Sequence, residues 1–157
     1  MRSPAPFALL LALCAPPAAS ASGDPFESEM VQAVDLFYGL RFEEARAAVS
    51  AAEARHPGHP GPMFYGAIVA FQEMLTEHGR STAPAAAFDA AAGRAVAAAE
   101  AWAGTSPAVS EYYHGAAYGF MARALYATKG PMAATGKARR AVRHLRRALE
   151  LDPAFED

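Results

Sequence analysis

The stretch FYGAIVAF, residues 64–71, returns 49 residues later as YHGAAYGF, residues 113–120. Both copies have an aromatic residue at each end and a glycine at the third position. One offset that holds over two separate segments indicates an internal repeat rather than chance similarity in an alanine-rich chain. In the segment that follows each copy, the same offset of 49 relates Ala92 to Ala141, Val96 to Leu145 and Ala99 to Ala148.

The composition favours helices along the whole chain of 157 residues. Alanine, the strongest helix former, is abundant, and extended runs of β-branched residues are absent. We therefore predict an all-α fold of six helices that pair as three antiparallel hairpins. The expected helices cover about residues 25–38, 42–55, 63–78, 84–103, 107–128 and 131–152.

Residues that start or stop helices set these boundaries. Asp24 is placed to cap the first helix, with Pro25 in its first turn and Glu27 three residues after the cap. The run HPGHPGP, residues 56–62, interrupts the chain between the second and third helices. Gly130 separates the fifth helix from the sixth, so short connections join consecutive helices.

Small residues recur where the paired helices are expected to touch. The first unit matches a known pattern through Ala33, Phe42-Glu43-Glu44-Ala45, Val49, Ala52 and Pro57. The second matches it through Gly66, Ala92, Val96 and Ala99, with Gly104 in place of the closing proline. The third matches it through Gly115, Tyr118, Ala141, Leu145, Ala148 and Pro153. The pattern resembles the tetratricopeptide repeat, a helix-turn-helix unit of about 34 residues.

This resemblance implies a repeat domain over residues 24–157, with units at about 26–57, 60–104 and 107–153. The units would stack as an α-α superhelix. The chain departs from the family in one respect. In the first unit, Ala33 and Ala45 are 12 positions apart, as the corresponding residues are in the family. The corresponding pairs of the second and third units, Gly66 with Ala92 and Gly115 with Ala141, are 26 positions apart. Lengthened helices or loops are therefore expected in those two units.

In such a superhelix, the first helices of successive units line a concave surface that binds peptides. By this resemblance, the surface would bind a protein partner through an apolar and aromatic strip. Aromatic residues at helical spacing also pack between helices, so a purely structural role in the core is the alternative. The expected partner-binding residues are Met30, Val34, Tyr38, Met63, Phe71, Tyr112 and Phe120.

The first residues resemble a secretory signal peptide. Arg2 is followed by an apolar run at residues 7–13, and the small residues ASA end the segment, which predicts a signal at residues 1–21. We therefore expect export to the periplasm or the extracellular space. A lipid anchor at Cys14 is the alternative, but it calls for a small residue before the cysteine, where Leu13 stands. Cys14 is the only cysteine, so no disulfide or thiolate site is expected after cleavage.

The sixth helix is basic and amphipathic, which is one pattern typical of membrane or nucleic-acid contact. A solvated outer face is the interpretation that we favour, and export together with a net charge of −2 argues against nucleic acid. We expect neither nucleic-acid nor membrane binding. The charge is nevertheless uneven, because residues 22–105 carry 11 acids and 5 bases, whereas residues 106–157 carry 5 acids and 8 bases.

Motifs for catalysis are missing from the sequence. It has no glycine-rich phosphate loop, no GxSxG and no HExxH. Glu73, Glu77 and His78 could hold a cation weakly, but a solvated helix end accounts for them. No catalytic residue, cofactor or metal is therefore expected.

The run ALELDP, residues 148–153, closes the third unit, and four residues follow it. The last unit of a repeat array normally needs a cap, so a flank near Leu145 and Leu149 is expected to lack a neighbour. A longer chain, another subunit or the basic side chains could cover it. We expect a non-enzymatic exported scaffold for protein–protein interaction. The alternative is a structural module of the cell envelope that self-assembles through this open end.

Overall fold

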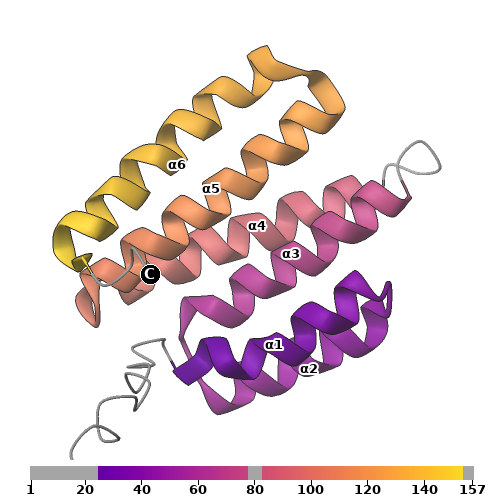
Figure 1. The fold of residues 1–157 in the computed structure, drawn as a ribbon, viewed down its shortest axis with the longest axis horizontal. Helices are drawn as coiled ribbons and strands as arrows, with labels where there is room; N and C mark the ends of the chain where they lie inside the picture. The colour runs from indigo at the N-terminus through magenta and orange to yellow at the C-terminus, as the bar shows by residue number, and fades with distance from the viewer. Residues whose placement is uncertain (1–24, 78–82, 154–157) are drawn as a thin grey trace, which may run out of the picture.

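The computed structural model describes residues 25–77 and 83–153 (Figure 1). These residues form six α-helices and one turn of 3-10 helix, and no strand occurs among them, so the all-α prediction is confirmed. The predicted signal peptide, Cys14 and the Asp24 cap lie outside this part of the chain. The helices are α1 (Pro25–Tyr38), α2 (Phe42–Arg55), α3 (Pro60–Thr76), α4 (Ala83–Ala101), α5 (Pro107–Lys129) and α6 (Pro131–Leu151), with the 3-10 turn at Trp102–Gly104.

Consecutive helices pair as hairpins, α1 with α2, α3 with α4 and α5 with α6. The hairpins lie side by side in chain order, from indigo α1 to yellow α6 (Figure 1). α3 packs against α2 and α5, and α4 packs against α5, so the second hairpin joins the other two. α6 packs chiefly against α5. The arrangement is a helical repeat in which each hairpin contacts its neighbours in sequence.

α3 begins three residues earlier than predicted, at Pro60 rather than Met63. Proline is tolerated in the first turn of a helix, where its missing N–H would have had no partner within the helix. His59 caps this end, because the backbone N–H of Gly61 donates to its Nδ1 at 3.1 Å. The proline-rich run therefore ends one helix and starts the next.

The extra residues of the second and third hairpins lie largely in longer helices. α1 and α2 each have 14 residues, whereas α3 and α4 have 17 and 19, and α5 and α6 have 23 and 21. In the third hairpin the connection is Gly130 alone, so all of its extension is helical. Figure 1 shows the short first hairpin beside the two longer ones.

The core lies where the three hairpins meet. Phe26, Val69 and Phe88 are among its largest fully buried side chains, and many of the smaller buried residues are alanines. Small side chains let helix axes approach closely. Ser110 is buried too, and its hydroxyl donates a hydrogen bond of 2.7 Å to the carbonyl oxygen of Ala99. This bond satisfies a buried polar group and joins α5 to the end of α4.

Two glycines allow close contacts that no larger residue would permit. A methyl group added at Gly61 would lie 2.1 Å from Cε1 of Phe26, and one at Gly115 would lie 2.6 Å from Cγ of Leu145. An uncovered flank was predicted around Leu145 and Leu149, but Leu145 packs onto α5 at Gly115 and both side chains are partly buried. The exposed apolar residues of α6 are instead Met132, Val142 and Leu151.

Candidate partner-binding groove

The seven residues predicted to bind a partner lie on α1, α3 and α5, the first helices of the three hairpins. Their exposure differs widely. Met30 and Phe71 are 1% and 3% exposed and belong to the core, as the structural alternative expected. Tyr38, at the end of α1, is 70% exposed. The remaining four are partly buried, and they are Val34, Met63, Tyr112 and Phe120.

Four of these seven residues line one hollow of about 190 Å³ between α1, α3 and α5. Phe71 lies at its floor, and Tyr38 stands exposed beside it. Met30, Met63 and Tyr112 do not line this hollow. Its lining consists of Val34, Phe37, Tyr38, Tyr65, Ile68, Phe71, Gln72, Phe120 and Arg123.

Two further hollows adjoin the first and extend it toward α6. The second has a volume of about 440 Å³ and shares Phe71 and Arg123 with the first. The third has a volume of about 900 Å³ and shares Tyr126, Ala134 and Ala138 with the second. We call the three together the binding groove. It crosses from α1 over α3 and α5 to α6, so it involves all three hairpins.

Sequence reasoning missed most of the lining of the groove, including the large side chains of Leu75, Arg123 and Tyr126. Leu75 lies one helical turn beyond Phe71, and Arg123 lies one turn beyond Phe120. The signal that could have found them was the lengthening of these helices, because longer first helices extend the concave face by further turns.

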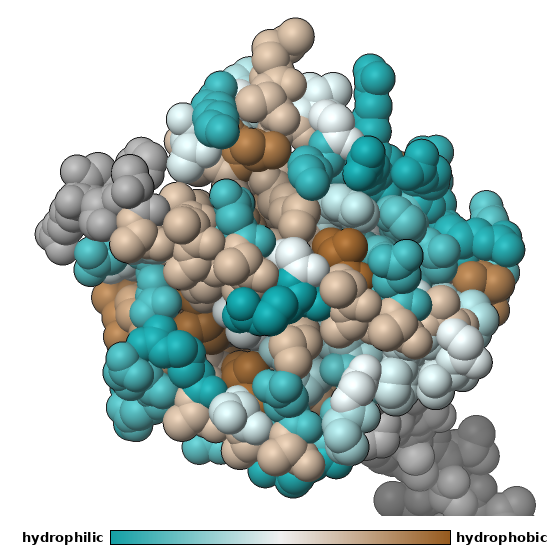
Figure 2. Space-filling view, turned by 180° about the vertical axis from the view of Figure 1, so that it is seen from behind, coloured by the Kyte–Doolittle hydropathy of each residue, from teal (hydrophilic) through white to brown (hydrophobic). Residues whose placement is uncertain are grey.

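α6 supplies a basic border to the third hollow. Arg139, Arg143 and Arg146 line it, and none of them pairs with an acid in the described part of the chain. Figure 2, which views the molecule from behind, shows hydrophilic side chains gathered at the upper right, on the side where α6 lies. Alanines and Val142 form the apolar floor of the third hollow, between these arginines. This border is therefore cationic at its rim and apolar at its base.

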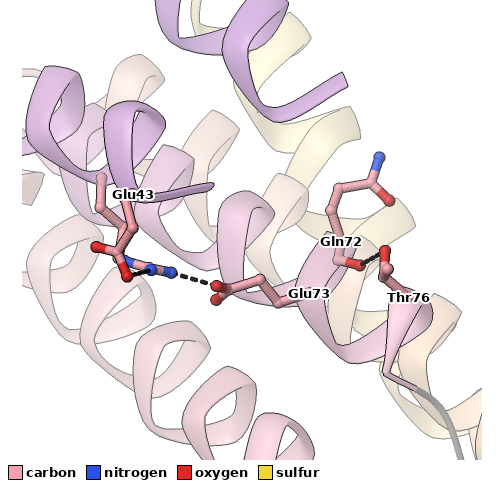
Figure 3. Close-up of polar contacts among 5 residues, drawn as sticks. Glu43, Gln72, Glu73 and Thr76 are labelled. Carbon is pink, nitrogen blue, oxygen red and sulfur yellow. Dashed lines mark hydrogen bonds and ion pairs between the residues drawn. The ribbon is translucent and has the colours of Figure 1, made fainter. Parts of the chain in front are cut away.

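An ion pair joins α2 to α3, and a side-chain hydrogen bond lies within α3 (Figure 3). Arg46 pairs with Glu43 at 2.6 Å and also with Glu73, and the hydroxyl of Thr76 donates to the carbonyl oxygen of Gln72 at 2.9 Å. Glu73 is thus an ion-pair partner of α2. His78, considered with Glu73 as a weak cation site, lies outside the described residues. Within residues 25–77 and 83–153, no three His, Asp or Glu side chains gather closely enough to hold a metal ion.

A stack of rings joins α5 to α6. The rings of His114 and His144 stack with centroids 4.9 Å apart, and Tyr118 stacks on His144 at 5.6 Å. His144 Nδ1 also lies 2.7 Å from a carboxylate oxygen of Glu111. Lys137 Nζ lies 5.0 Å from the ring centre of Tyr118. These contacts hold α6 against α5.

This stack predicts an acid-sensitive contribution to stability. Burial lowers the pKa of His114, and His144 lowers it further, while Glu111 and Glu100 act in the opposite direction. The unfolded chain then binds a proton more readily than the folded one, so this contribution is complete above about pH 6.5 and is lost as the pH falls below it. We expect His114→Gln to flatten the fall in Tm between about pH 7.5 and 5.5, as measured by circular dichroism. Equal slopes for variant and wild type would contradict this.

Comparison with known proteins adds no family. No protein-family model matches the chain, and no curated protein or solved structure matches it either. None of the helices described here combines the length and apolar character needed to cross a membrane. The resemblance to the tetratricopeptide repeat therefore rests on the residue pattern of the sequence.

Proposed function

We propose that this protein is a non-enzymatic, tetratricopeptide-like scaffold that binds a segment of another protein in the binding groove. One observation carries the proposal. Four exposed large apolar side chains of the protein border the three adjoining hollows, and they are those of Tyr38, Leu75, Tyr126 and Val142. Exposed apolar side chains scattered singly are normal, but a contiguous apolar surface indicates an interaction site.

The shape of the groove favours a protein segment over a small metabolite. The hollows follow one another across four helices, and large apolar or aromatic side chains stand beside each of them. A segment with several apolar side chains could fill successive hollows and cover the exposed residues between them. Burial of Tyr38 and Tyr126 would supply much of the affinity, because aromatic anchors that enter pockets commonly dominate such interfaces.

Export is part of the same proposal. The signal peptide expected at residues 1–21 would place the scaffold in the periplasm or outside the cell, where it would meet its partner. Binding there would rely on apolar burial and charge alone and would involve no covalent chemistry.

The test compares aromatic residues that border the groove with apolar residues that do not. Peptides are selected from a random library against the chain, and their affinities are measured by fluorescence anisotropy. Tyr38→Ala and Tyr126→Ala are each expected to weaken binding about tenfold or more, which is the usual size of an anchor effect. Val31→Ala and Met132→Ala are the matched controls, because both residues are exposed and neither lines the hollows.

Equal losses in the control variants would place the binding surface elsewhere. The alternative function, self-assembly through the last hairpin, is favoured by the exposure of Met132 and Leu151 on α6. It predicts no selected peptide, a molar mass that rises with concentration in light scattering, and a return to monomer in Met132→Ser. That combination of results would replace the proposed function with the alternative.

A further inference from the structure

Arg123 is an exposed cation placed between apolar hollows. It lines both the first and the second hollow, and its guanidinium lies 5.3 Å from the ring centre of Phe71 and 5.1 Å from that of Phe120. Contact with both rings restricts this exposed side chain, whose guanidinium N–H groups can donate hydrogen bonds to a partner. No acid in the described part of the chain pairs with it.

Basic side chains outnumber acidic ones along the groove. No acid lines the first or the second hollow. Two line the third, and both have partners, since Glu111 contacts His144 at 2.7 Å and Glu150 contacts Arg147 at 2.9 Å. Four lining arginines are left without an acid among the described residues, and they are Arg123, Arg139, Arg143 and Arg146. The groove is therefore cationic on a chain whose net charge is −2.

From this juxtaposition we infer that the groove selects an acidic amphipathic segment of another protein. An Asp or Glu side chain of that segment pairs with Arg123, and its apolar side chains fill the hollows on either side. The inference rests on the proposed function and specifies the chemistry of its partner. A guanidinium already held in place loses little entropy on binding, so its bond to a carboxylate adds affinity and fixes the register of the segment.

A second copy of the chain fits the groove less well, although residues 22–105 are acidic overall. Several acids of the first hairpin already have partners there, because Glu29 contacts Arg55 at 3.1 Å, Glu43 contacts Arg46 and Glu44 contacts Arg41. An anionic bilayer fits less well too. Its surface is broad and flat, whereas Arg123 lies between two hollows and contacts the aromatic rings that line them.

The experiment uses two peptide libraries with the same apolar positions. Asp and Glu occupy the polar positions of one library, and Lys and Arg occupy those of the other. We expect binders only from the acidic library. Arg123→Gln should weaken them about tenfold, as expected for loss of one charged hydrogen-bonded contact, and should reduce the salt dependence of binding. Arg123→Lys should recover part of the loss. Arg94→Gln, an exposed change on α4 outside the hollows, should have no effect.

The outcomes separate this inference from the proposed function. Binders from the basic library, or binders that tolerate Arg123→Gln while losing affinity in Tyr38→Ala, would overturn the inference and leave the groove as the binding site. Absence of any binder from either library would overturn both. Vesicles of phosphatidylcholine and phosphatidylserine provide the third arm. Binding to them that is lost in Arg123→Gln would make the groove a lipid-binding surface and overturn the choice of a protein segment.

Discussion

Replacing Phe88 with alanine is expected to lower the free energy of unfolding by about 3–5 kcal/mol. Phe88 is 1% exposed, and its ring packs on that of Phe71 with centroids 5.6 Å apart. The loss combines the transfer free energy of the ring with the cost of the cavity that it leaves. Because Phe71 is also the floor of the first hollow, the same change should loosen the groove. Urea denaturation followed by circular dichroism measures the effect.

Tyr38→Ala is the control for Phe88→Ala. It also removes an aromatic ring, but from a side chain that is 70% exposed, so we expect the free energy of unfolding to change by no more than about 0.5 kcal/mol. The two variants should therefore differ by several kcal/mol in the free energy of unfolding. Of the two, only Tyr38→Ala should weaken binding while the protein keeps its full stability. Similar unfolding free energies for the two variants would show that Phe88 is not part of a closely packed core.

Gly115→Ala is the second large effect, with an expected loss of about 1–3 kcal/mol from overpacking. The added methyl group would lie 2.6 Å from Cγ and 3.0 Å from the backbone nitrogen of Leu145. A side chain can rotate away, but a backbone atom moves only with its helix, so α6 would have to shift on α5. Such a shift would also disturb the third hollow, which residues of both helices line. Thermal and urea unfolding of the variant measure the loss.

Gly119→Ala makes the same substitution one turn further along α5. There Cβ of Ala141 on α6 would be 4.0 Å from the new methyl group, which is an ordinary contact. Alanine favours a helix over glycine by up to about 1 kcal/mol, so we expect a gain in stability. Opposite signs for the two variants would establish the close approach at Gly115. Stabilisation by both would mean that α5 and α6 separate easily at that point.

Helix boundaries were largely predictable because proline and glycine mark them in the sequence. The predicted ranges of the first two helices agree with α1 and α2, and Gly130 separates α5 from α6 as expected. The start of α3 was placed too late because prolines were taken as breaks, although they are accepted in a first turn. The residue at which α3 begins depends on a capping contact, the hydrogen bond from the backbone N–H of Gly61 to His59. This bond depends on the orientation of the His59 side chain, which has no direct signal in the residue pattern.

The groove was predictable only in part. Helical periodicity identifies the face on which Tyr38 and Phe71 lie, but it does not tell which turns of that face a neighbouring helix covers. Phe71 is covered by Phe88 and Phe120, whose rings lie 5.6 and 5.3 Å away, whereas Tyr38 lies at the end of the short first hairpin. The position of Arg123 was not predictable because it depends on two rings from different helices.

α6 has one main packing partner, α5, whereas α3 and α4 are held on several sides. A helix that packs on a single neighbour can open while the remainder stays folded, so the amide hydrogens of α6 should exchange with solvent sooner than those of α3 and α4. A segment bound across the groove would contact α6 together with the hairpins before it. Each opening of α6 would then cost part of that contact, and occupancy of the groove would slow hydrogen exchange along the whole last helix.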